Sequence, residues 1–190
     1  MVIDYSETIN KYTQPDTYPL PKIDELVNTI AKYKVYSTID LRSAYYQIPL
    51  LEKDRQFTAF ETDGKLWHYI RMPFGVTNGS ACFQRIMDDF VSKYKLRDTF
   101  PFINNLTICG KDQNGRDKNL EKFEMAAKSE GFTMNEDKCV YSTTTLDFLG
   151  YRISHTTLSP DPERLAPLNP PTPTDQKSLK RIVGMFFLLC

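Results

Sequence analysis

FPFINNLTICG, residues 100–110, contains two short runs of strand-forming residues on either side of two asparagines. Aromatic and β-branched residues favour strands, and asparagine accepts the positive φ angles of a tight turn. The stretch therefore predicts a β-hairpin with strands at residues 100–103 and 106–109, which meet at Asn104 and Asn105.

Helical and strand patterns precede this hairpin. Residues 23–31 carry apolar side chains at i, i+3, i+4 and i+7 spacing, which predicts a helix with one buried face. VYSTIDL, residues 35–41, alternates in the manner of a strand and places Asp40 near its C-terminal end. The Asp63-Gly64 pair predicts a second hairpin turn, between FTAFET and LWHYIR.

A long helix is expected between these strands and the 100–110 hairpin. Ser80 can cap it, and its apolar face would consist of Phe83, Ile86, Met87, Phe90, Val91 and Tyr94. After the hairpin, residues 117–129 predict another helix, which ends at Gly131, and CVYS, LDFLG and YRIS predict short strands. The order of elements indicates an α+β fold.

The C-terminal part has a different composition. Six prolines between residues 160 and 174 are incompatible with regular helix or central strand, so this stretch is interpreted as a linker. A helical pattern then starts near Asp175 and is still running at Cys190, as expected of a fragment. The predicted organisation is a domain at 1–159, a linker at 160–174 and the start of a helix at 175–190.

Charge and cysteine content limit the possible functions. Lys and Arg total 24 and Asp and Glu total 24, so net charge does not steer the chain toward nucleic acid, and such binding would need a local basic patch. The four cysteines form no CxxC pair, which favours reduced thiols in an intracellular setting and argues against structural zinc. No apolar run has the length of a signal-peptide core or a membrane span, so no membrane partner is expected.

Seven motifs in series resemble the reverse transcriptase of gypsy-type LTR retrotransposon Pol polyproteins. They are YPLPKIDELV at residue 18, YSTIDLRSAYYQIPL at 36, FTAFET at 57, RMPFGVTNGSACFQRIMD at 71, FPFINNLTICG at 100, NEDKC at 135 and FLGYRIS at 148. The resemblance implies a right-hand polymerase palm, which is a ferredoxin-like βαββαβ antiparallel sheet with helices on one face, together with partial fingers. It also implies that residues 175–190 begin a truncated thumb or connection helix and that the rest of the polyprotein is missing.

The resemblance implies a catalytic site that holds two Mg²⁺ ions on three aspartates. Asp40 matches the first and would be a metal ligand, whereas Asn104 and Asn105 stand where the family has the aspartates of its YxDD motif, which here reads FINN. An amide resembles a carboxylate in shape but has no charge, so the charge from the three positions falls from about −3 to about −1. We expect polymerisation to be strongly impaired. Mutational decay, G to A hypermutation and deliberate inactivation all remain open.

The remaining site residues follow from the same resemblance. It implies binding of a deoxynucleoside triphosphate by Arg42, Ser43, Ala44, Tyr45, Phe74, Gly75 and Lys138, with Tyr45 packed under the sugar. It implies template and primer contacts by Gln84, Arg85, Leu149, Gly150 and Tyr151. Ser6 stands where relatives often have an arginine that contacts the triphosphate, and Arg55 or Lys53 is a possible substitute.

Simpler structural interpretations exist for each of these residues. Asn-Asn is a good turn on any hairpin, Tyr45 can be an ordinary buried tyrosine, and Lys138 can be a solvated loop lysine. Two function classes therefore remain. One is an intracellular nucleotidyltransferase that acts on a primed RNA or DNA template, and the other is a non-catalytic derivative that binds nucleic acid or protein. An unrelated ferredoxin-like domain is a third, weaker possibility. The oligomeric state is left open.

Overall fold

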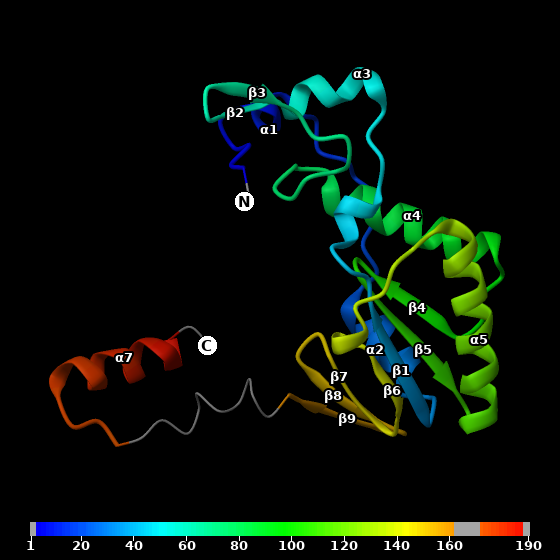
Figure 1. Ribbon diagram of the computed structural model, residues 1–190. Helices are drawn as coiled ribbons and strands as arrows, with labels where there is room; N and C mark the ends of the chain where they lie inside the picture. Colours follow the sequence, from blue (N-terminus) through cyan, green and yellow to red (C-terminus); the bar gives the residue numbers. More distant parts are fainter. Residues whose placement is uncertain (1–2, 162–171, 188–190) are drawn as a thin grey trace.

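The computed structural model describes residues 3–161 and 172–187, and its centre is a four-stranded antiparallel sheet (Figure 1). The strand order is β4-β5-β1-β6. The strands are β1 (Val35–Asp40), β4 (Thr99–Phe102), β5 (Asn105–Gly110) and β6 (Val140–Thr143). Along the chain, helix α4 (Gly79–Lys93) lies between β1 and β4, and helix α5 (Gln113–Glu130) lies between β5 and β6. The predicted ferredoxin-like βαββαβ palm is confirmed.

Helices α4 and α5 cover one face of this sheet. Strand residues alternate between faces, so Ile39 of β1 and Leu106 and Ile108 of β5 point toward the helices. They pack against helix residues that are also fully buried, which include Phe83, Met87 and Phe123. Burial of each such side chain contributes roughly 1.5–3 kcal/mol, which makes this layer the main core of the protein.

The opposite face carries α2 (Ile23–Ile30) and a second sheet (Figure 1). That sheet is antiparallel, with β7 (Thr145–Phe148), β8 (Tyr151–Ser154) and β9 (Thr157–Pro160) in chain order. Its core consists of Val27, Ile30, Tyr36, Cys109, Leu146, Phe148 and Ile153. Strand β9 was not predicted, and it includes Pro160, which the sequence assigned to the linker. A proline is tolerated there because β9 is an edge strand.

Short elements at one end of the palm form the fingers portion (Figure 1). They are α1 (Ile9–Tyr12), the 3₁₀ helix η1 (Ala44–Gln47), α3 (Glu52–Arg55), the 3₁₀ helix η2 (Gln56–Thr58), β2 (Phe60–Thr62) and β3 (Lys65–Trp67). Asp63 and Gly64 join β2 to β3 with φ angles of 53° and 67°, which confirms the predicted two-residue turn.

The C-terminal helix α7 (Gln176–Phe187) starts next to Asp175, as predicted. The Asp175 carboxylate accepts a hydrogen bond of 2.7 Å from the backbone N–H of Ser178, which caps the helix. Most of the predicted linker and the last three residues lie outside the described residues. Within residues 3–161 and 172–187, no helix has both the length and the apolar character needed to cross a membrane.

Two predicted helix starts need correction. Helix α4 begins at Gly79, so the N-cap position belongs to Asn78 and not to Ser80. The Asn78 side chain does not cap α4, because it bonds the backbone of Gln14 and Asp16 instead. Helix α5 begins four residues before residue 117, where the Asp112 side chain accepts from the Gly115 N–H at 2.7 Å. The polar first turn of α5 lacks the apolar periodicity that sequence reasoning used.

The turn of the hairpin formed by β4 and β5 also differs from the prediction by one residue. Phe102 pairs with Asn105, so the turn consists of Ile103 and Asn104, and Asn105 belongs to β5. Ile103 has a φ angle of 52°, which is unusual for a β-branched residue. The expectation that asparagine supplies the positive φ angle is therefore wrong.

Candidate active site

A pocket of about 600 Å³ opens where β1, the hairpin turn and the segment after α5 meet. Its size is within the range usual for small-ligand sites. Eight of the residues selected from the sequence line it. The full lining is Asp40, Leu41, Arg42, Ser43, Ala44, Tyr45, Phe74, Asn104, Met134, Asn135, Glu136, Asp137 and Lys138. The fold brings these residues together from four separate parts of the sequence.

Asp40 and Asn105 form a cross-strand pair at the end of β1 and β5. Paired residues on antiparallel strands point to the same face of the sheet, so both side chains lie on the face away from α4 and α5. Asn104 completes the group, because its side-chain Nδ2 donates a hydrogen bond of 3.2 Å to Oδ2 of Asp40. The three predicted positions are thus adjacent.

Backbone hydrogen bonds fix Asp40 in this place. The Leu41 N–H donates to the Asn104 carbonyl at 3.1 Å, and the Asn135 N–H donates to the Asp40 carbonyl at 2.8 Å. The hairpin turn and the 133–139 segment are therefore attached to β1 on its two sides. A shift of either segment would move the Asp40 carboxylate.

The residues at this site do not fit a pair of Mg²⁺ ions. Magnesium requires hard, mostly anionic oxygen ligands in near-octahedral geometry. Asp40 supplies one carboxylate, and Asn104 directs an N–H donor, not an acceptor, toward that carboxylate. Across the described ranges, no three His, Cys, Asp or Glu side chains are grouped closely enough to hold a metal ion.

Two acidic residues of the pocket were missed by sequence reasoning. Glu136 and Asp137 lie on the 3₁₀ helix η3 (Glu136–Lys138) and line the same pocket as Asp40. Both belong to the NEDKC motif, from which Lys138 was the sole residue selected. The pocket lining therefore carries three carboxylates and two cations, Arg42 and Lys138.

Tyr45 is held by aromatic and polar contacts on several sides. Its ring meets Phe74 edge-on at 5.0 Å between centroids and Phe83 at 5.5 Å. Its hydroxyl is 2.9 Å from Oγ of Ser80, the side chain in the first turn of α4. A Cβ at Gly79 would lie 3.4 Å from the ring and 3.3 Å from Cγ2 of Val76, so the start of α4 packs closely against Tyr45.

The loop with Phe74 and Gly75 bends sharply next to Tyr45. Gly75 has a φ angle of 89°, and a Cβ there would lie 3.2 Å from the Ile3 carbonyl oxygen. Gly75 lines a smaller pocket of about 270 Å³ that shares Tyr45 and Phe74 with the main pocket.

Arg55 and Lys53, named as possible substitutes for the cation missing at Ser6, are not among the lining residues of either pocket. Arg55 donates to the Leu50 carbonyl at 3.4 Å. Ser6 itself bonds Asp4, with 2.6 Å between Oγ of Ser6 and Oδ1 of Asp4. The cations of the main pocket are thus Arg42 and Lys138.

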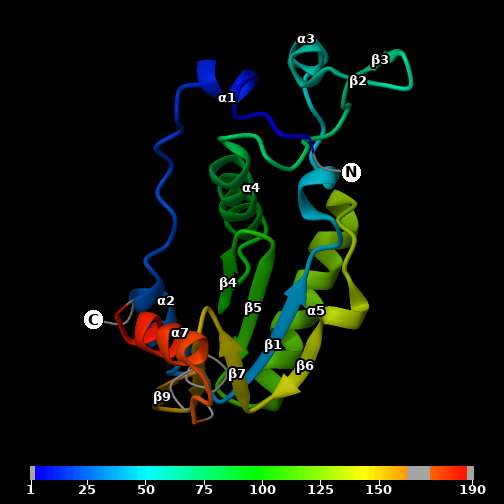
Figure 2. The same ribbon diagram turned by 90° about the vertical axis from the view of Figure 1, so that its left-hand side faces the viewer.

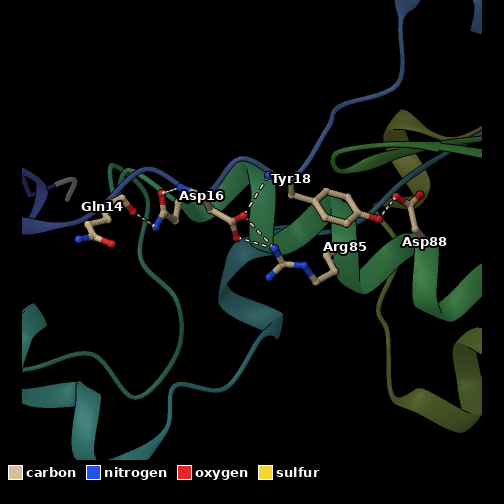
Figure 3. A network of polar contacts seen from close by, with 6 residues as sticks. Gln14, Asp16, Tyr18, Arg85 and Asp88 are labelled. Atoms are coloured by element: carbon tan, nitrogen blue, oxygen red, sulfur yellow. Dashed lines mark hydrogen bonds and ion pairs between the residues drawn. The ribbon is translucent and has the colours of Figure 1, made fainter.

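The two predicted template ligands on α4, Gln84 and Arg85, differ in exposure. Gln84 is fully buried, with 0% of its surface exposed, and its amide bonds protein groups at both ends. Nη2 of Arg85 lies 2.8 and 2.7 Å from the two carboxylate oxygens of Asp16, and its guanidinium stacks 4.8 Å from the centre of the Tyr18 ring (Figure 3). Burial leaves Gln84 no surface for a phosphate.

Leu149 and Gly150 form the two-residue turn between β7 and β8, with φ angles of 51° and 85°. Tyr151 follows on β8, and its hydroxyl donates to Oδ1 of Asp24 on α2 at 3.2 Å. Phe148, just before the turn, meets Phe102 of the β4-β5 hairpin edge-on, with 6.2 Å between the ring centroids. The turn is therefore packed beside the hairpin that carries Asn104 and Asn105.

Comparison with known proteins identifies the family. A family model described as reverse transcriptase (RNA-dependent DNA polymerase) matches residues 2–153. The Retrovirus-related Pol polyprotein from transposon opus of Drosophila melanogaster is 32% identical over 186 residues, which are 97% of this chain and 18% of that polyprotein. The Pol polyprotein from transposon gypsy of the same species is 28% identical over 87% of this chain and 16% of its own length. The chain thus spans less than a fifth of these relatives.

Solved structures agree with this fold. The foamy viral protease-reverse transcriptase in complex with double-stranded DNA has a TM-score of 0.83 and 23% identity, over 99% of this chain and 33% of that one. Its complex with an RNA/DNA hybrid has a TM-score of 0.82 and 24% identity, over 98% of this chain and 25% of that one. The fold, the order of motifs and the matched family model agree, and the chain belongs to the reverse transcriptase family.

Proposed function

We propose that this chain is the palm and partial fingers of a gypsy-type retrotransposon reverse transcriptase that no longer supports efficient polymerisation. The ancestral activity is RNA-directed synthesis of DNA on a primed template. The observation that carries the proposal is the hydrogen bond from the Asn104 amide to the Asp40 carboxylate, at 3.2 Å. An N–H donor occupies the space in which a metal-binding site needs a second anionic oxygen.

Charge explains the size of the expected loss. Phosphoryl transfer depends on positioning and on neutralising the charge that develops on the phosphate oxygens. The three positions supply one negative charge instead of three, so two divalent ions would repel each other with little compensation. We expect a loss of several orders of magnitude in the rate of primer extension, since each 1.4 kcal/mol of lost stabilisation is about tenfold.

The nucleotide would bind in the main pocket. The Tyr45 ring, fixed by Phe74 and Ser80, offers a flat apolar surface for a sugar. Arg42 and Lys138 line the same pocket and supply the cations that a triphosphate needs. Gly75 and the Leu149-Gly150 turn remain proposed contacts for the nucleotide and the primer end. Arg85 remains a proposed template contact that would first have to leave Asp16.

The test is Mg²⁺-dependent primer extension by the purified chain and by the Asn104→Asp/Asn105→Asp variant. We expect extension by the variant and at least about a thousandfold less by the unaltered chain. Asn114→Asp, on the exposed first turn of α5, adds a negative charge far from the hairpin and should extend no better than the unaltered chain. Efficient extension by the unaltered chain would refute the proposal.

A second candidate function is nucleic acid binding without chemistry. The structural relatives described above are complexes with double-stranded DNA and with an RNA/DNA hybrid, and this chain shares their fold. A labelled RNA/DNA hybrid that shifts on addition of the unaltered chain, with an affinity that falls as salt rises, would support this role. No shift at low salt would argue against it.

A further inference from the structure

Strand β4 lies at the edge of the four-stranded sheet, and it leads directly into the 103–104 turn. The outer side of an edge strand has backbone groups without a strand partner. Pro101 has no N–H to leave unpaired, but its carbonyl and the Ile103 N–H still need partners. Both are supplied by one buried side chain of α4.

That side chain is Gln84. Its Oε1 accepts from the Ile103 N–H at 2.7 Å, and its Nε2 donates to the Pro101 carbonyl at 3.2 Å. The amide thus offers one acceptor and one donor to β4, as a neighbouring strand would. Ile103 is the turn residue with a φ angle of 52°, so the Gln84 contact lies at a backbone conformation that a β-branched residue rarely adopts.

Gln84 is itself connected to a distant segment. Its Nε2 also donates to Oδ1 of Asp88 at 3.0 Å, one helical turn along α4, and Oδ2 of Asp88 accepts from the Tyr18 hydroxyl at 2.6 Å. The Asp88 carboxylate raises the pKa of Tyr18 to about 12, so the hydroxyl keeps its proton at any physiological pH.

Tyr18 belongs to the extended segment 13–22, which links α1 of the fingers to α2 of the palm (Figure 2). The N-cap residue of α4 and one side chain on α4 attach this segment at two further points (Figure 3). Asn78 accepts from the Asp16 N–H and donates to the Gln14 carbonyl, and Arg85 bonds the Asp16 carboxylate. The segment is therefore fixed along α4, and Tyr18 contacts Asp88 from a defined position.

We propose that Gln84 is a positioning residue for the 103–104 turn and that segment 13–22 stabilises it through Tyr18 and Asp88. The path runs from Tyr18 to Asp88, to Gln84, to the Ile103 backbone, and ends at Asn104 beside Asp40. A segment that joins fingers to palm thereby influences the geometry of the site. The inference deepens the proposed function because it concerns the same hairpin, but its test uses no catalysis.

The test is amide hydrogen exchange of Ile103, measured by NMR on the full chain, together with the resonance of the Asn104 side-chain amide. Tyr18→Phe removes one hydroxyl and keeps the ring over Arg85. We expect about fivefold faster exchange at Ile103 and a shifted Asn104 amide signal, since one hydrogen bond in the path is lost. Tyr12→Phe, at a tyrosine of α1 that is 83% exposed, is the matched control and should change neither quantity.

Gln84→Met keeps the shape of the side chain and removes its hydrogen bonds, so we expect at least about tenfold faster exchange at Ile103. Denaturant unfolding of each variant separates local from global loosening. Equal Ile103 exchange in Tyr18→Phe and Tyr12→Phe would overturn the proposal, even if Gln84→Met does not fold. A chain that extends primers well would refute the proposed function and leave this exchange result unaffected.

Discussion

At the scale of single residues, the proposed replacement of a carboxylate by an amide at position 104 would change both charge and hydrogen bonding. A carboxylate at position 104 would repel Asp40, whereas the Asn104 amide donates to it. An amide at this position therefore avoids a repulsion that a metal-binding site must balance with bound cations. Stability and metal binding are expected to change in opposite directions.

Thermal unfolding with and without Mg²⁺ measures how an aspartate pair at positions 104 and 105 changes stability and metal binding. In the presence of a chelator, we expect Asn104→Asp/Asn105→Asp to be less stable than the unaltered chain by about 1 kcal/mol or more. Mg²⁺ should raise the melting temperature of the variant, because an ion that binds the folded state stabilises it, and should leave the unaltered chain unchanged. An equal rise in both proteins would contradict the assignment of the metal positions.

At the scale of elements, α4 joins the core, the site and segment 13–22. Phe83 faces the sheet and touches Tyr45, Gln84 bonds the hairpin, and Asp88 accepts from Tyr18. Most of this follows from the spacing of residues on one helix, since side chains three and four apart share a face. The helix is the element through which packing and site geometry are linked.

Truncation of the core face of α4 should be costly. Phe83→Ala is expected to destabilise the protein by about 3–5 kcal/mol, because Phe83 is fully buried and a cavity would remain. Phe57→Ala removes the same number of atoms from a side chain that is 58% exposed and should cost much less. Denaturant unfolding of both variants gives the comparison, and similar losses would show that the described core is wrong.

The Tyr18 hydrogen bond predicts a pH dependence. Because the Asp88 carboxylate raises the pKa of Tyr18 from 10 to about 12, the stabilisation is fully present below pH 10 and is lost as pH rises toward 12. The ultraviolet titration of the native chain minus that of Tyr18→Phe should show one phenol that ionises near pH 12. A difference curve centred near pH 10 would show that the bond to Asp88 is absent in solution.

The sequence predicted these elements to different degrees, and the reasons are physical. Periodicity and turn chemistry located β1, α2, α7 and the Asp63-Gly64 hairpin, because their signals are local. The Ile103 turn was misplaced by one residue because Gln84, far away in sequence, supports a backbone conformation that isoleucine disfavours. Gln84 was assigned to the template for the same reason, since its burial depends on tertiary contacts.

At the scale of the whole molecule, the chain has a formal net charge of zero, so any binding of nucleic acid would depend on local contacts. We therefore expect weak binding of an RNA/DNA hybrid, with an affinity that decreases steeply between low and physiological salt. Fluorescence anisotropy across a salt series measures this, and tight, salt-independent binding would contradict it.

The central claim is that ancestry and activity have separated at Asn104 and Asn105, and one assay tests it most directly. Primer extension with Mg²⁺ is measured for the unaltered chain and for Asn104→Asp/Asn105→Asp at equal concentration. The account predicts extension that appears with the two aspartates and is at least about a thousandfold weaker without them. Equal extension by both proteins would contradict it.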